Sequence, residues 1–180
     1  ASGRTLTYNG SDLNIGSYTL SITGGGTLNN ANPINLGQVS SVFRLAGTNN
    51  IISGNVLLGG GTLDVDENAT VSGDIAMSAS SSLDISLGRT LIYSGSTINI
   101  GPRNLVLSGS GIFDNGNEIN LNDSTSTLSV TGSNGTINKL AVNGADLTAG
   151  KIDVNGDFTV NTLSLVNTAN IDIAAATGMS

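Results

Sequence analysis

The chain has 180 residues, with no cysteine and no histidine, and its 13 acidic and 6 basic residues give a net charge of −7. This balance leaves no basic stripe for phosphates, so we expect neither nucleic acid nor an anionic membrane surface as a partner. Without cysteine, neither a disulfide nor a thiolate metal site can hold the fold together. No run of about 18 apolar residues is present, so we expect no membrane insertion. Only 3% of residues are aromatic, which predicts a narrow aliphatic core.

The chain contains a long internal duplication. A shift of 85 residues places RTLTYNGSDLNIGSYTLSITGGGTLNNANPINL, which starts at Arg4, over RTLIYSGSTINIGPRNLVLSGSGIFDNGNEINL, which starts at Arg89. Further along, the match needs gaps: TVSGDIAM near Val71 is aligned with DVNGDFTV near Val154, and SLDISLGRT is echoed by NIDIAAATG. We therefore interpret residues 1–180 as a single repetitive domain made of two duplicated blocks, 4–88 and 89–173, that belong to a longer array.

Within each block, two apolar residues separated by one other residue recur about every seven positions. This alternation predicts short strands with both apolar side chains on one face. The residues between the pairs are Gly, Asn, Asp and Ser, which favour turns. In the second block the pairs are Leu91 and Tyr93, Ile98 and Ile100, Leu105 and Leu107, Ile119 and Leu121, and Leu128 and Val130.

Strands of three or four residues are not stable alone, so they must stack on one another. Three strands per coil give about 21 residues per turn, and each strand then pairs in parallel with its counterpart in the next coil. The predicted fold is all-β: a right-handed parallel β-helix, or β-solenoid, of eight or nine coils and about 40 Å in length. A left-handed solenoid, which needs an apolar residue at every sixth position, is the less favoured alternative.

Exposed aromatic rings can stack on sugars, so the three tyrosines are candidate sugar-binding residues. Tyr8 and Tyr93 occupy matching places in their apolar pairs, which indicates core packing. Tyr18 corresponds to Arg103 in the second block, so this position tolerates a charge and is expected to face solvent. A single exposed tyrosine is ordinary, and we assign it no binding role.

The densest acidic group comprises Asp64, Asp66 and Glu67, with Asp74 ten residues after the first of these. Paired carboxylates perform glycoside hydrolysis, and carboxylate oxygens bind Ca²⁺. However, no Lys or Arg lies close in sequence to Asp64, and the segment lacks the ligand order of an EF-hand. We interpret the group as a solvated turn with outward strand positions, and assign no catalytic, cofactor-binding or metal site. A metal ion at Asp64, Asp66 and Glu67 is left open.

Coils of roughly 20 residues, turns rich in Gly, Asn and Ser, the absence of cysteine, and phrases such as GGGTLDVDENATVSGDI from Gly59 characterise the chain. In these features it resembles the β-helical passenger and repeat regions of autotransporter and filamentous-haemagglutinin-type bacterial adhesins. The resemblance covers the whole chain but includes no short motif specific to one member. It implies export, an extracellular or cell-surface location, and a role in adhesion or as a stalk.

The sequence therefore predicts a structural or adhesive repeat module of a large secreted or surface-displayed bacterial protein, and not an enzyme. It would act as a rigid stalk or fibre without a cofactor. Open terminal coils are unpaired edges, so the expected partners are copies of the chain or adjoining solenoid repeats, together with surface glycans or proteins of host or neighbouring cells. The alternative is a polysaccharide-binding or polysaccharide-processing β-helix, which would need acidic residues from different coils to converge in one groove.

Overall fold

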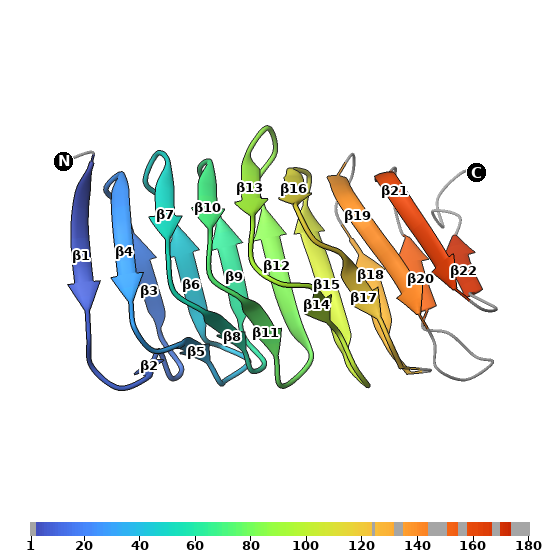
Figure 1. Cartoon of the computed structure of the whole chain (residues 1–180), viewed down its shortest axis with the longest axis horizontal. Helices are drawn as coiled ribbons and strands as arrows, with labels where there is room; N and C mark the ends of the chain where they lie inside the picture. The colour runs from blue at the N-terminus through green and yellow to red at the C-terminus, as the bar shows by residue number, and fades with distance from the viewer. Residues whose placement is uncertain are drawn as a thin grey trace, which may run out of the picture.

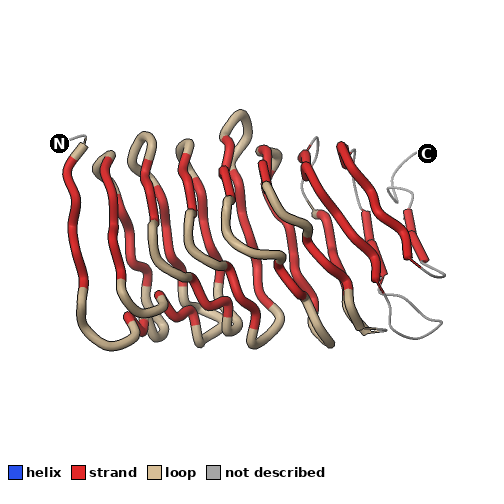
Figure 2. The backbone as a smooth tube through the Cα atoms, viewed as in Figure 1, coloured by secondary structure: helices blue, strands red, loops and turns tan. Residues whose placement is uncertain are grey.

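The computed structural model describes residues 3–123, 125–131, 135–143, 151–154, 158–166 and 170–173. Throughout these residues the secondary structure is β-strand and turn without any helix, and all strand pairs are parallel. Figure 1 shows the strands stacked side by side along one axis, and Figure 2 shows the turns gathered at the ends of the strands. The predicted all-β solenoid is confirmed. In this described part, no helix is long and apolar enough to cross a membrane.

The strands form three faces of the solenoid. Face 1 comprises β1 (Arg4–Tyr8), β4 (Gly26–Asn30), β7 (Asn50–Ile52), β10 (Ala69–Val71), β13 (Thr90–Tyr93), β16 (Ile112–Asn115), and the first parts of β19 (Gly135–Asn143) and β21 (Phe158–Val166). Face 2 comprises β2 (Leu13–Asn14), β5 (Ile34–Leu36), β8 (Val56–Leu58), β11 (Ile75–Met77), β14 (Ile98–Asn99), β17 (Ile119–Leu121), and the second parts of β19 and β21. Face 3 comprises β3 (Thr19–Ile22), β6 (Val42–Leu45), β9 (Thr62–Val65), β12 (Ser81–Ile85), β15 (Asn104–Gly109), β18 (Thr127–Val130), β20 (Lys151–Val154) and β22 (Asn170–Ile173).

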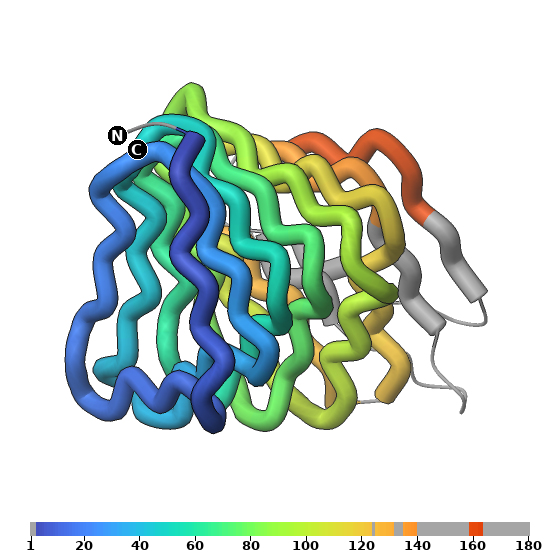
Figure 3. The backbone as a smooth tube through the Cα atoms, turned by 60° about the vertical axis from the view of Figure 1, so that its left-hand side comes forward, coloured from blue at the N-terminus to red at the C-terminus, as the bar shows by residue number. Residues whose placement is uncertain are grey.

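Each coil takes one strand from each face. Strands β1 to β18 make six coils, and β19 to β22 continue the stack. The coil length averages about 22 residues, close to the predicted 21, but it varies: Thr27 pairs with Ile51, whereas Ile51 pairs with Thr70. In Figure 1, face 1 runs down the near side and face 3 runs up the far side as the chain advances from left to right, which is a right-handed course. Figure 3 shows the coils one behind another.

The core is a continuous aliphatic column inside the coils. All ten apolar residues of the second-block pairs are at most 7% exposed, as predicted from their alternation. Phe43, Leu63 and Leu83 follow one another in register on face 3 and are almost fully buried. The aromatic rings of Tyr93 and Phe113 stack with centroids 6.0 Å apart.

The duplication is visible in the strands, because β1 to β6 recur as β13 to β18. For example, β2 and β14 begin 85 residues apart, and so do β5 and β17. The later, gapped alignment of Val71 with Val154 is wrong: Val71 lies on face 1 and Val154 on face 3. Coil lengths differ between the blocks, so a short sequence match shifted the alignment onto a different face. Asp84 and Asp172, in contrast, both lie on strands of face 3.

Buried asparagines hold the corner between faces 1 and 2. Asn30 donates from Nδ2 to the carbonyl oxygens of Asn32 and Asn55, at 3.0 and 3.2 Å, and accepts from the Gly54 N–H at 3.1 Å. Its duplicate, Asn115, is fully buried and makes the equivalent set of bonds to its own turn and to the next coil. Where the chain turns, these side chains take the place of the backbone hydrogen bonds between strands, so the buried backbone groups stay hydrogen-bonded.

Candidate functional site

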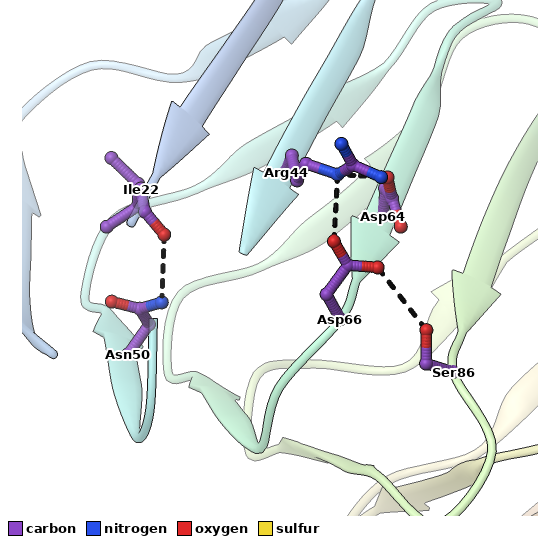
Figure 4. A network of polar contacts seen from close by, with 6 residues as sticks. All are labelled: Ile22, Arg44, Asn50, Asp64, Asp66 and Ser86. Atoms are coloured by element: carbon purple, nitrogen blue, oxygen red, sulfur yellow. Dashed lines mark hydrogen bonds and ion pairs between the residues drawn. The ribbon is translucent and has the colours of Figure 1, made fainter. Parts of the chain in front are cut away.

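The acidic group lies at the corner between face 3 and face 1 and is bound by a cation from the preceding coil. Asp64 points outward from β9, and Asp66 follows in the turn. Arg44 Nε on β6 donates to Asp64 Oδ2 at 2.9 Å, and Asp66 Oδ2 lies 2.9 Å from the same nitrogen (Figure 4). From the following coil, Ser86 Oγ lies 3.3 Å from Asp66 Oδ1. Nearby, the buried Asn50 side chain donates to the Ile22 carbonyl at 3.3 Å.

A second cation binds the same turn from the other side. Arg89 Nη1, just before β13, lies 2.9 Å from Glu67 Oε2. No Lys or Arg lies close to Asp64 in the sequence, but the fold brings Arg44 beside it from the preceding coil. Parallel register places Arg44 directly opposite Asp64, one coil away. A search for opposite charges about one coil length apart would have found Arg44 and Arg89.

Burial and neighbouring charges of both signs act on the Asp64 carboxylate. Burial raises the pKa of Asp64, the nearby charges of Asp66 and Asp84 raise it further, and the Arg44 guanidinium opposes the shift. Since the Asp64 and Asp66 oxygens share one nitrogen neighbour, they lie no more than about 6 Å apart. The guanidinium of Arg44 occupies the space between them. Both carboxylates are therefore paired with this one cation.

Asp74 does not join this group. It lies in the turn between β10 and β11, at the corner of faces 1 and 2, because ten residues correspond to about half a coil. Its Oδ1 accepts from the Ser96 N–H at 2.8 Å, and the hydrogen bonds from Ser96, chiefly that of the backbone, lower the pKa of Asp74. No group of three or more potential metal ligands lies together within the residues that the structure describes.

A polar depression lies on face 2, where the two blocks meet. Its volume is about 360 Å³, and Asp74, Arg103 and Asn122 are among its lining residues. Here the ladder of the described face 2 strands is interrupted, because the four-stranded sheet ends at β11. The Ile75 N–H donates instead to the Tyr93 hydroxyl at 3.1 Å. The depression thus offers a carboxylate, a guanidinium and an amide to a hydroxyl-rich ligand.

The tyrosines lie where the sequence predicts, with one difference. Tyr93 is 1% exposed, and its hydroxyl donates to the Ser96 carbonyl at 2.6 Å, whereas Tyr8 is half-buried because β1 has a neighbouring strand on one side only. Burial raises the pKa of Tyr93. Tyr18 is 77% exposed, as expected for a position that tolerates a charge.

The chain matches no protein-family model, no curated protein and no solved structure. The likeness to autotransporter and filamentous-haemagglutinin-type repeats therefore stays an expectation from the sequence. Function has to be inferred from three features of the fold: the charged corner around Arg44, the polar depression between the blocks, and the stacked core.

Proposed function

We propose that this chain is a structural and adhesive repeat module of a large secreted, surface-displayed bacterial protein, and that it acts as a rigid stalk or fibre without catalytic activity. The observation that carries this proposal is the unbroken eight-stranded parallel ladder of face 3 above a continuous aliphatic core. Backbone hydrogen bonds run along the rod axis on each face. Bending the rod would distort several ladders at once, so the stack is stiff.

The charged corner supports a mechanical role. Arg44 and Asp64 come from adjacent coils, and so do Glu67 and Arg89, so both ion pairs run along the rod axis. Each of these partly exposed pairs contributes less than about 1 kcal/mol alone. Together with the Ser86 contact to Asp66, they connect three successive coils by side chains as well as by backbone.

Adhesion would use the broad polar faces and would bind surface glycans or proteins of host or neighbouring cells. A second candidate function is polysaccharide binding in the depression between the blocks, whose lining includes Asp74, Arg103 and Asn122. Hydroxyl groups of a sugar match this combination of acceptors and donors. Both functions are non-catalytic and are compatible with one stiff rod.

The location is tested by antibody labelling of intact bacterial cells that produce the protein. We expect labelling without permeabilisation and its loss after external protease treatment; labelling only after permeabilisation contradicts surface display.

Polysaccharide binding and the absence of catalysis are tested by incubation of the chain with a panel of acidic and neutral polysaccharides. Binding that Arg103→Ala weakens and Arg4→Ala leaves unchanged supports the depression as the binding site. Release of new reducing ends or unsaturated uronic acids would show an enzyme and overturn the proposal.

A further inference from the structure

Face 1 carries an outward column in which threonine and isoleucine alternate. Parallel register aligns Thr27 with Ile51, Ile51 with Thr70, and Thr70 with Ile92, on the neighbouring strands β4, β7, β10 and β13. Ile51 and Ile92 are 40% and 45% exposed, whereas Thr27 and Thr70 are half-buried. Recessed and protruding side chains therefore alternate along the rod axis.

A hollow lies between the two protruding isoleucines. Its volume is about 380 Å³, and it is lined by Ile51, Thr70 and Ile92 together with Asn68 and Thr90. Register places Thr70 midway between the two isoleucines, so the hollow lies over Thr70. The isoleucines are two strand spacings apart, about 10 Å, which leaves room for one aliphatic side chain between them.

This part of face 1 is uncharged. The strands β4, β7, β10 and β13 contain no charged residue, whereas the face 3 strands of the same coils include Arg44, Asp64 and Asp84. Asp114 follows Ile92 in the column and bounds the uncharged strip at that end. Because the whole chain has a net charge of −7, two copies repel each other least where uncharged surfaces meet.

The residues on both sides of the column are polar and uncharged. On one side, Ser53, Ser72 and Ser94 follow the strands β7, β10 and β13 and are exposed. On the other side, Asn49 and Asn68 precede β7 and β10 and are exposed as well. The strip thus has an apolar centre and a polar rim, which is the arrangement of a protein–protein interface.

Reversal of the column exchanges its protruding and recessed positions. From Ile92 back to Thr27 the order is Ile, Thr, Ile, Thr, so an antiparallel copy places an isoleucine opposite each threonine. We propose that two copies of this chain pair side by side through face 1, with their rod axes antiparallel and related by a two-fold axis. Ile51 of one copy packs into the hollow over Thr70 of the other, and Ile92 packs over Thr27. Each contact occurs twice, as in any isologous interface.

The same two-fold axis matches the rims of the two copies. Ser53 of one copy lies opposite Ser72 of the other, and Asn49 lies opposite Asn68. The contact spans four strand spacings, about 19 Å along the rod axis, and has the small size of weak, transient interfaces. Association should therefore need a high protein concentration. Salt should strengthen it, because salt screens the repulsion between two acidic chains and the contact contains no ion pair.

Sedimentation equilibrium of the 180-residue chain over a concentration series, at low and high salt, tests the pairing. We expect the weight-average mass to rise from that of one chain towards that of two and no further. Ile51→Asp should weaken association by about 10-fold or more, because it puts a charge into the hollow of the other copy. Val39→Asp, an exposed apolar position in the turn between β5 and β6, is the matched control and should leave association unchanged. Circular dichroism spectra show whether Ile51→Asp remains folded.

A pair of opposite charges tests the antiparallel register. Ile51→Lys and Thr70→Glu chains should each associate weakly alone and about 10-fold more tightly when mixed, since the lysine of one copy lies opposite the glutamate of the other. Ile51→Lys mixed with Thr27→Glu is the control, with the same charges at positions that lie two coils apart across the interface.

A single-chain mass at every concentration overturns the proposal, and so does association that Ile51→Asp leaves unchanged. Growth beyond two chains would contradict a closed two-fold pair. A mixture of Ile51→Lys and Thr70→Glu that associates no more tightly than the control mixture would contradict the register. The proposal concerns the side of the rod and goes beyond the stalk function, which these outcomes leave in place.

Discussion

Leu6 and Leu91 occupy the same position in the two halves of the duplication, but Leu6 is 64% exposed and Leu91 is fully buried. Leu91 lies in register between Ala69 of the preceding coil and Phe113 of the following one. Leu6 has a neighbour, Leu28, on one side only. Full burial of a leucine side chain stabilises a fold by about 1.5–3 kcal/mol, so a central coil gains more from the same residue than an edge coil does.

We expect Leu91→Ala to lower the free energy of unfolding by about 2–5 kcal/mol, because it leaves a cavity between two coils. Leu6→Ala should cost less than about 1 kcal/mol in the monomeric chain, since most of this side chain is already in water. Urea unfolding followed by circular dichroism at low protein concentration measures both values. Equal losses for the two variants would be inconsistent with the stacking order.

Stacked glycines allow close approach of the coils at the corner between faces 1 and 2. A Cβ at Gly73 would collide with the Gly54 carbonyl of the preceding coil, so Gly73→Ala should cost more than about 2 kcal/mol. Gly88 has a φ of +72° but no atom within 4 Å of an added Cβ, so Gly88→Ala should cost only the left-handed backbone penalty of about 1–2 kcal/mol. Thermal unfolding of the two variants separates the two causes, and a smaller effect at Gly73 would refute close coil contact.

The buried Asn115 should contribute more to stability than Asn99, whose side chain accepts a hydrogen bond from Asn120 on the surface of face 2. Asn115→Ala leaves buried N–H and carbonyl groups of its turn and of the next coil without partners, at a cost of about 2–4 kcal/mol. Asn99→Ala removes a surface bond from Asn120, 2.9 Å long, and should cost less than about 1 kcal/mol. Urea midpoints measured at one pH make the comparison. The interpretation fails if Asn99→Ala is the more damaging change.

The charged corner should respond to pH with a defined sign. The pKa of Asp64 is higher in the folded than in the unfolded chain, so its ionisation lowers stability as the pH rises through the interval between the two values. Asp64→Asn should therefore be more stable than the parent at pH 7, by less than about 1 kcal/mol because the pair is partly exposed, and the difference should vanish at low pH.

Asp74 is the control for Asp64, because its pKa is shifted in the opposite direction. The pKa of Asp74 is lowered by the Ser96 hydrogen bonds, so its charge stabilises the fold above the unfolded pKa, and this stabilisation is lost as the pH falls through the folded value. Asp74→Asn should be less stable than the parent at pH 7, with a difference that disappears in acid. Urea unfolding between pH 3 and pH 7 measures both variants. If Asp64→Asn and Asp74→Asn changed the stability at pH 7 in the same direction, the environments assigned to the two carboxylates would be contradicted.

The repeating apolar pairs predicted the strands, the three-strand coil and the buried residues, because alternation and turn residues are local properties of the chain. The ion pairs around Asp64 were not predicted, since Arg44 becomes its neighbour only through coil register. The gapped alignment of Val71 with Val154 failed because coil lengths vary between blocks. Small insertions in turns thus limit what a repeat pattern reveals about register.

The central claim is that the coils form one stiff stack, and a distance measurement along face 3 tests it most directly. The chain has no cysteine, so Thr19→Cys and Ser129→Cys can carry a pair of spin labels without interference. Both positions lie in one outward column of face 3, five coil steps apart, which corresponds to about 24 Å along the axis. Double electron–electron resonance should give a single narrow distance distribution near this value, unchanged at moderate urea concentrations. A broad distribution, or one centred well away from this distance, would contradict a rigid stack.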